Sequence, residues 1–127
     1  TILLVDDEPI ILDIGDEILG QYGYKVLKAG GGEEAVQLYK NHKNRIDLVI
    51  LDYNMPGIDG GRCLQELLKI NPAVKVLMAS GYALNDQIRA TLSAGAAGFI
   101  GKPYQLKEIL QQVRSVLDQN RFGAYAN

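Results

Sequence analysis

Four apolar runs of this chain are each followed by polar residues that could do chemistry. The runs are residues 2–5, 48–51, 74–79 and 98–101, and they are followed in turn by Asp6 and Asp7, Asp52, Ser80, and Lys102. If the runs are parallel strands, these side chains meet at one edge of a sheet, where open parallel sheets bind their ligands. Three crowded carboxylates resist ionising together unless a cation joins them. The chemistry that fits is a divalent metal, a phosphoryl group and an acceptor aspartate.

Helical patterns separate these runs, so strands and helices alternate along the chain. A further short strand is expected at 24–28. After the first strand, Ile11, Ile14 and Ile18 recur on one helical face. The last helix has the clearest 3.6-residue period, through Leu106, Ile109, Leu110, Val113 and Leu117. Five strand–helix units predict a doubly wound α/β sheet with helices on both faces.

Length, charge and composition limit the class of protein. The chain has 127 residues and a net charge of -2, which fits one domain and gives no sign of binding to nucleic acid or a membrane surface. The single Cys63 excludes an internal disulfide and fits a reducing, cytoplasmic location. Residues 1–118 are expected to form the domain. Residues 119–127 show little periodicity and are expected to be a C-terminal tail or linker stub.

Four motifs in this order resemble the receiver domains of two-component response regulators. The sequences VDDE at 5–8, DYNMPGIDG at 52–60, SG at 80–81 and GFIGKP at 98–103 carry the resemblance, which covers roughly residues 1–118. It implies a flavodoxin-like (βα)5 fold with a parallel five-stranded sheet in the order 2-1-3-4-5.

The resemblance also implies a role for each site residue. Asp52 would accept the phosphoryl group, with Mg²⁺ or Mn²⁺ as cofactor. The metal ligands would be Asp7, Asp52, the backbone carbonyl of Asn54, and Asp6, the last acting through water. Ser80 would hydrogen-bond the phosphoryl oxygens, Lys102 would pair with them, and the Lys102–Pro103 peptide bond would be cis.

A switch and its partners follow from the same resemblance. The phosphoryl group would draw Ser80 inward and turn Phe99, which changes the surface made by the fourth helix, the fifth strand and the fifth helix. Asn54 and Tyr82 would tune the hydrolysis of the acyl phosphate. The donor would be a histidine kinase or a histidine phosphotransfer domain, and the changed surface would contact an output domain, a partner protein or a second copy. The domain would be regulatory rather than an enzyme, although it would assist its own phosphorylation and dephosphorylation.

Other functions remain open at this point. A haloacid-dehalogenase-like phosphatase also uses a nucleophilic Asp, Mg²⁺ and Lys, but it needs a second Asp two residues after the nucleophile, where this chain has Asn54. An interaction module that works without phosphorylation would not need the full set of acceptor residues. A flavin- or nucleotide-binding domain is a further alternative, which the glycines at 30–32 do not support because no phosphate-binding motif surrounds them.

Overall fold

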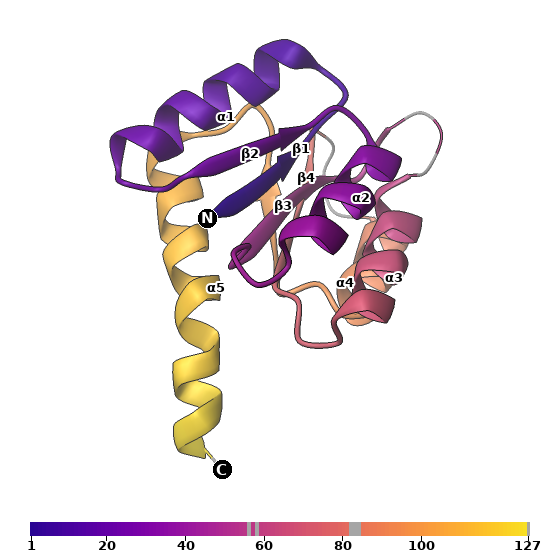
Figure 1. Cartoon of the computed structure of the whole chain (residues 1–127), viewed down its shortest axis with the longest axis vertical. Helices are drawn as coiled ribbons and strands as arrows, with labels where there is room; N and C mark the ends of the chain where they lie inside the picture. The colour runs from indigo at the N-terminus through magenta and orange to yellow at the C-terminus, as the bar shows by residue number, and fades with distance from the viewer. Residues whose placement is uncertain (56, 58, 82–84, 127) are drawn as a thin grey trace.

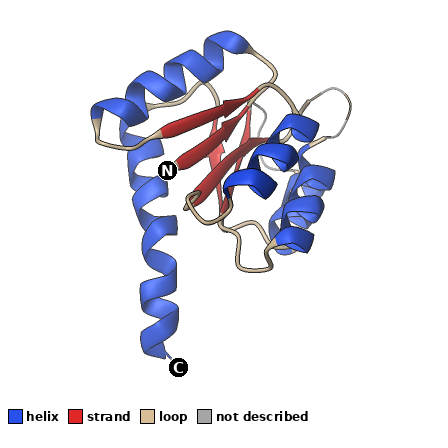
Figure 2. Cartoon of the chain, viewed as in Figure 1, coloured by secondary structure: helices blue, strands red, loops and turns tan. Residues whose placement is uncertain are grey.

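The computed structural model describes residues 1–55, 57, 59–81 and 85–126, and for 120–126 it describes the backbone alone. Within these residues strands and helices alternate (Figures 1 and 2). The strands are β1 (Ile2–Val5), β2 (Val26–Ala29), β3 (Leu48–Asp52), β4 (Val76–Ser80) and β5 (Gly98–Gly101). The helices are α1 (Pro9–Gln21), α2 (Gly32–His42), α3 (Gly60–Ile70), α4 (Asp86–Ser93) and α5 (Leu106–Ala126).

All neighbouring strands pair in parallel, in the order β2-β1-β3-β4-β5. The predicted flavodoxin-like order is therefore confirmed. Every residue of β1, β3 and β4 is buried, whereas the edge strands β2 and β5 are partly exposed. Because both faces of the central strands are covered, their sequences are continuous apolar runs rather than alternating ones.

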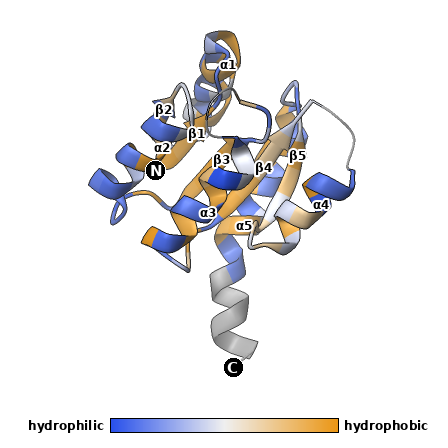
Figure 3. Ribbon diagram, turned by 90° about the vertical axis from the view of Figure 1, so that its right-hand side faces the viewer, coloured by the Kyte–Doolittle hydropathy of each residue, from blue (hydrophilic) through white to orange (hydrophobic). Residues whose placement is uncertain are grey.

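Two hydrophobic clusters fill the spaces between the sheet and its helices. One joins alternate strand residues such as Leu3 and Val49 to α2 and α3, and the other joins residues such as Leu4 and Ile50 to α1 and α5. Figure 1 shows α1 and α5 on one side of the sheet and α2, α3 and α4 on the other. In Figure 3 the strands are largely hydrophobic, while polar segments lie on the outer helices.

The alternation of side chains sets which residues can meet beyond the strand ends. Leu4 and Ile50 face the α1 and α5 side, so Asp6 and Asp52, each two residues later, continue on that side. Lys102 follows Ile100 in the same way. The parallel register brings the ends of β1, β3 and β4 level with one another.

The buried face of α1 only partly matches the face marked by the isoleucine spacing, since Ile11 and Ile18 are half-buried against the core. The buried residues are Leu12, Gly15 and Leu19, whereas Ile14 is 41% exposed. This helix is apolar around most of its circumference, so periodicity alone does not select a face. The choice is made by Gly15, where a Cβ atom would lie 2.5 Å from a methyl group of Leu4.

The last helix is longer than expected. The backbone of α5 continues to Ala126, so residues 119–126 are helical instead of irregular. In Figure 1 this end of α5 extends beyond the rest of the domain. Its proposed role as a linker stays a prediction. None of the helices in the described part of the chain is both long and apolar enough to cross a lipid bilayer.

Candidate functional site

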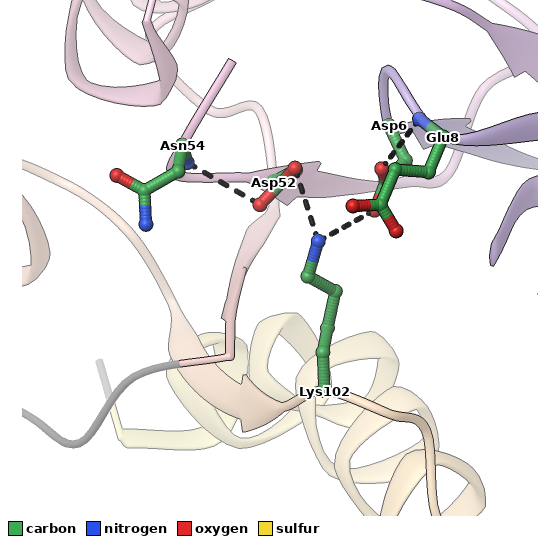
Figure 4. Close-up of polar contacts among 5 residues, drawn as sticks. All are labelled: Asp6, Glu8, Asp52, Asn54 and Lys102. Atoms are coloured by element: carbon green, nitrogen blue, oxygen red, sulfur yellow. Dashed lines mark hydrogen bonds and ion pairs between the residues drawn. The ribbon is translucent and has the colours of Figure 1, made fainter.

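Lys102 links two buried carboxylates at the carboxyl edge of the sheet (Figure 4). Its Nζ donates a hydrogen bond to Oδ2 of Asp6 at 2.9 Å and lies 3.1 Å from Oδ2 of Asp52. The side chains of Asp6 and Asp52 are 0% and 1% exposed, and that of Lys102 is 13% exposed. Residues 96 positions apart along the chain thus form one polar cluster.

Short loops after the strands orient both carboxylates. The backbone N–H of Glu8 donates to Oδ1 of Asp6 at 2.9 Å, and that of Asn54 donates to Oδ1 of Asp52 at 3.3 Å. Each aspartate therefore accepts a hydrogen bond from the backbone two residues ahead, as Asp side chains often do in turns. These contacts leave the Oδ2 atoms of the two residues directed towards Lys102.

The surroundings of the cluster make it unfavourable for all of its carboxyl groups to be ionised at once. Burial, together with the nearby charge of Asp6, raises the pKa of Asp52 to about 6, although Lys102 partly offsets the effect. Burial by itself would lower the pKa of Lys102, but its ion pairs with Asp6 and Asp52 outweigh that effect and the net change is upward. Lys102 is therefore a permanent cation shared by two carboxylates, and negative charge remains in excess.

The acidic residues fit a divalent cation. Carboxylate oxygens of Asp6, Asp7 and Asp52 all lie within 4.8 Å of one another. Oδ2 of Asp52 is buried, and among the described residues it has no hydrogen-bond partner, because its approach to Lys102 meets the distance of an ion pair but not hydrogen-bond geometry. This oxygen is therefore available to bind a cation. Mg²⁺ binds through one or two carboxylates, a few other oxygens and water, which matches this donor set.

A cleft of about 440 Å³ opens over the cluster. Asp7, Asp52, Asn54 and Lys102, to which the sequence analysis assigned roles, line it. It is also lined by residues that the sequence analysis did not single out, namely Glu8, Ile11, Gly81 and Pro103. Glu8, Gly81 and Pro103 belong to the motifs but had no role assigned, and Ile11 lies outside them.

Ser80 is the last residue of β4, and Phe99 lies on β5. Ser80 is buried and its backbone carbonyl accepts a hydrogen bond from the N–H of Lys102 at 2.9 Å, but Ser80 is not among the residues that line the cleft. Phe99 is half-buried against the cluster that contains Met78, its neighbour across β4 and β5. Tyr82, predicted to tune hydrolysis, lies outside the described residues.

The chain turns sharply after Lys102. The Lys102–Pro103 peptide bond is cis, as predicted, and Tyr104 then enters the core beside α1 and α5. The backbone amide of Gly101, just before the lysine, donates to the carboxylate of Glu108 on α5 at 3.3 Å. These contacts fix the segment from which Lys102 extends to the acids.

Comparison with known proteins gives a consistent result. The family model described as the response regulator receiver domain matches residues 2–114. Sensor kinase CckA of Brucella abortus is 37% identical over 120 residues, which are 94% of this chain and 13% of the kinase. Chemotaxis protein CheY of Bacillus subtilis is 33% identical over 118 residues, 92% of this chain and 97% of that protein. The chain thus spans a small part of one relative and nearly all of another.

Solved structures agree in fold. A chain in the CheX–CheY–BeF3–Mg²⁺ complex from Borrelia burgdorferi superposes with a TM-score of 0.86 at 36% identity, covering 91% of this chain and 87% of that one. A response regulator receiver domain protein from Clostridium thermocellum gives a TM-score of 0.89 at 28% identity, with 95% and 96% covered.

Proposed function

Because this chain belongs to the response regulator receiver domain family, we propose that Asp52 is its phosphoryl acceptor. The observation that carries the proposal is the position of Asp52: it is buried among two other aspartates and lies 3.1 Å from Lys102. A carboxylate in that setting is a nucleophile held beside a fixed cation, which is what a phosphoryl transfer to a side chain needs.

The transfer uses the groups of this chain as follows. One carboxylate oxygen of Asp52 forms a bond to phosphorus while the bond between phosphorus and the nitrogen of a donor imidazole breaks. The electron pair of that bond leaves with the imidazole, and the product is an acyl phosphate on Asp52. Lys102 then shifts part of its pairing from the carboxylates to the phosphoryl oxygens, and Ser80 is proposed to donate its hydroxyl to one of them.

Receiver domains bind Mg²⁺ at an acidic pocket, and the residues of this site fit that ion. We assign the ligands to Asp7, Asp52 and the backbone carbonyl of Asn54, with Asp6 in a supporting role. When bound, the metal offsets charge on the phosphoryl oxygens. Asp7 is suited to capture it because its side chain is exposed in the cleft, whereas Asp6 is already engaged with Lys102 and the backbone of Glu8.

The proposed signalling output depends on the elements next to the site. The receiver family is regulatory, and we propose that this domain assists its own phosphorylation and dephosphorylation without turning over a substrate. Phe99 and Ser80 both lie on or beside the β4–β5 pair, so a move of Ser80 can reach the surface formed by α4, β5 and α5. The proposed partners are a histidine kinase or phosphotransfer domain as donor, and an output domain or second copy on that surface. The proposal keeps the cytoplasmic location expected from the sequence.

Intact mass after incubation with acetyl phosphate and Mg²⁺ tests this proposal. We expect one phosphoryl adduct on the wild-type chain and none on Asp52→Asn or when EDTA replaces Mg²⁺. Asp7→Asn is expected to keep the fold and to react at least about tenfold more slowly, in line with the usual cost of losing a group around a metal site.

Asp13→Asn is the matched control. Asp13 is an exposed acid on α1, paired with Lys28 and outside the cleft. It should react as the wild type does. An adduct of equal yield on Asp52→Asn would remove Asp52 from its role.

A further inference from the structure

The start of α3 is built directly against the peptide of Asp52. The backbone N–H of Gly60, the first residue of the helix, donates to the carbonyl of Tyr53 at 2.9 Å. The N–H of Tyr53 in turn donates to Ala79 on β4 at 2.8 Å. The residue that follows Asp52 is therefore held from both sides, by the next strand and by the next helix.

The helix can approach this closely only because residue 60 has no side chain. A Cβ atom on Gly60 would lie 2.6 Å from the carbonyl oxygen of Asp52, 2.6 Å from Cα of Tyr53 and 3.0 Å from Cε of Met78. The methionine end could move aside, but the first two atoms belong to the backbone. Any side chain here must therefore push α3 and the end of β3 apart.

The neighbouring glycine does not share this constraint. A Cβ atom on Gly61 would meet its nearest atoms, Oδ1 of Asp59 and Oγ1 of Thr91, at 3.5 Å, an ordinary contact distance. Two adjacent glycines in the first turn of one helix thus differ sharply in their surroundings. Glycine is costly in a helix relative to alanine, so its presence at position 60 is explained by the close approach.

The rest of α3 is fixed and cannot easily yield. Asp59 caps the helix, its Oδ1 accepting from the N–H of Arg62 at 2.9 Å and its carbonyl from the N–H of Cys63 at 2.9 Å. Cys63, Leu64 and Leu67 are fully buried against the sheet. A displacement at Gly60 is therefore not absorbed by the helix alone and also reaches the end of β3, where Asp52 lies.

We propose that Gly60 is a positioning residue for Asp52. The absence of a Cβ atom lets the end of α3 press on the Asp52 peptide, which holds the carboxylate in the geometry set by the N–H of Asn54 and by Lys102. This inference rests on the proposed function only for its effect on phosphoryl transfer. The positioning itself is a statement about structure and can be measured separately.

The test compares Gly60→Ala with Gly61→Ala, two variants of identical chemistry one residue apart. In the metal-free protein, the amide resonance of Asn54, whose N–H bonds to Asp52, is expected to shift in Gly60→Ala and to stay in place in Gly61→Ala. With acetyl phosphate and saturating Mg²⁺, we expect the rate of adduct formation to fall about 10- to 100-fold in Gly60→Ala, the loss typical of a misplacement near 1 Å. The rate of Gly61→Ala should stay within about twofold of the wild-type rate, because its new methyl group makes only contacts of ordinary packing distance.

A loss of stability alone must be told apart from a loss of position. Leu64→Ala, a core truncation one turn further along the same helix, is the control, because it destabilises the fold and leaves Gly60 in place. It should retain the wild-type Asn54 resonance and rate at temperatures where it is folded. Should Gly60→Ala not fold, the double variant with Gly61→Ala gains helix propensity and is measured instead.

Each outcome decides the question. A wild-type rate and an unmoved Asn54 resonance in Gly60→Ala would overturn the proposal, as would failure of both the single and the double variant to fold, since Gly60 would then be a requirement of the fold itself. If the wild type forms no adduct, the proposed function falls, while the Asn54 resonance still decides whether Gly60 positions Asp52.

Discussion

At the scale of single residues, the site is an acid cluster that is short of positive charge. One lysine is shared by two buried carboxylates, and a third lies within 4.8 Å of them. Asp52 is the residue most affected, since its pKa is raised to about 6 mainly by burial. The same crowding that makes ionised Asp52 costly in the metal-free state favours a cation in the pocket, so the raised pKa of Asp52 and the fit of the site to a cation have one physical cause.

The charge of Asp52 is therefore expected to destabilise the metal-free fold. Its pKa is 3.8 in an unperturbed chain and about 6 when folded. Between those values the folded state holds a proton that the unfolded state has lost, so the free energy of unfolding falls as the pH rises from 4 to 6. Asp52→Asn has no such group, and its stability relative to the wild type should increase over this window by up to about 3 kcal/mol and stay constant above it.

Urea unfolding in EDTA at several pH values from 4 to 8 measures this difference. Acids away from the cluster titrate equally in both proteins, so the comparison isolates residue 52 together with the groups that its charge touches directly. A difference that does not change with pH would show that Asp52 ionises normally in the fold.

At the scale of elements, close helix–strand contacts place the site. On one side of the sheet Gly15 lets α1 rest on Leu4 of β1, and on the other Gly60 lets α3 rest on the end of β3. The first contact brings α1, and with it Ile11 and Glu8, to the rim of the cleft. Both contacts depend on a missing side chain rather than on a favourable one.

This gives a prediction for α1. Gly15→Ala should lower the free energy of unfolding by about 1–3 kcal/mol, because its methyl group would lie 2.5 Å from a side-chain atom of buried Leu4. Gly20→Ala, on the same helix, meets nothing within 4 Å and should be neutral or stabilising by up to about 1 kcal/mol. Thermal unfolding of the two variants measures the contrast, and equal effects would mean that the helix slides freely on the strand.

The sequence predicted the elements better than the contacts between them. Continuous apolar runs mark buried parallel strands, so the sheet and the meeting of Asp6, Asp52 and Lys102 at its edge could be anticipated. The buried face of α1 was only partly predicted, because Ile11 and Ile18 pack against the core but Ile14 is exposed. The centre of that face is set by Gly15, which periodicity does not mark. Gly60 was missed as well. The signal for it was present, since two consecutive glycines at the start of a strongly amphipathic helix are costly unless one is needed for close packing.

At the scale of the whole molecule, the fold links Asp52, the proposed acceptor, to a distant surface through two strands. Met78 of β4 faces Phe99 of β5 in the sheet register, and Ser80 pairs with Gly101 beside Lys102. A change at Ser80 thus has a short path to β5 and to the helices α4 and α5. A nearly complete switch from about 1:99 to 99:1 needs about 5.5 kcal/mol. Charge-assisted hydrogen bonds of about 1.5–3 kcal/mol each, made by Ser80 and Lys102, could supply much of it.

Amide hydrogen exchange before and after phosphorylation tests this link. We expect changed exchange near Ser80 and Phe99. Little change is expected around Tyr39 of α2, which is buried near β1 and β2, at the opposite end of the sheet from β5. A change confined to the residues that line the cleft would argue for a readout by direct contact with the site instead of through β5.

The most direct test of the account is to locate the phosphoryl group on the chain. Borohydride reduces an acyl phosphate to an alcohol, so trapping the protein after reaction with acetyl phosphate and Mg²⁺ converts the acceptor aspartate into homoserine, which peptide mass spectrometry can find. The account predicts conversion at Asp52 and retention of Asp6 and Asp7. Conversion at either of those residues, or anywhere else with Asp52 unchanged, would contradict it.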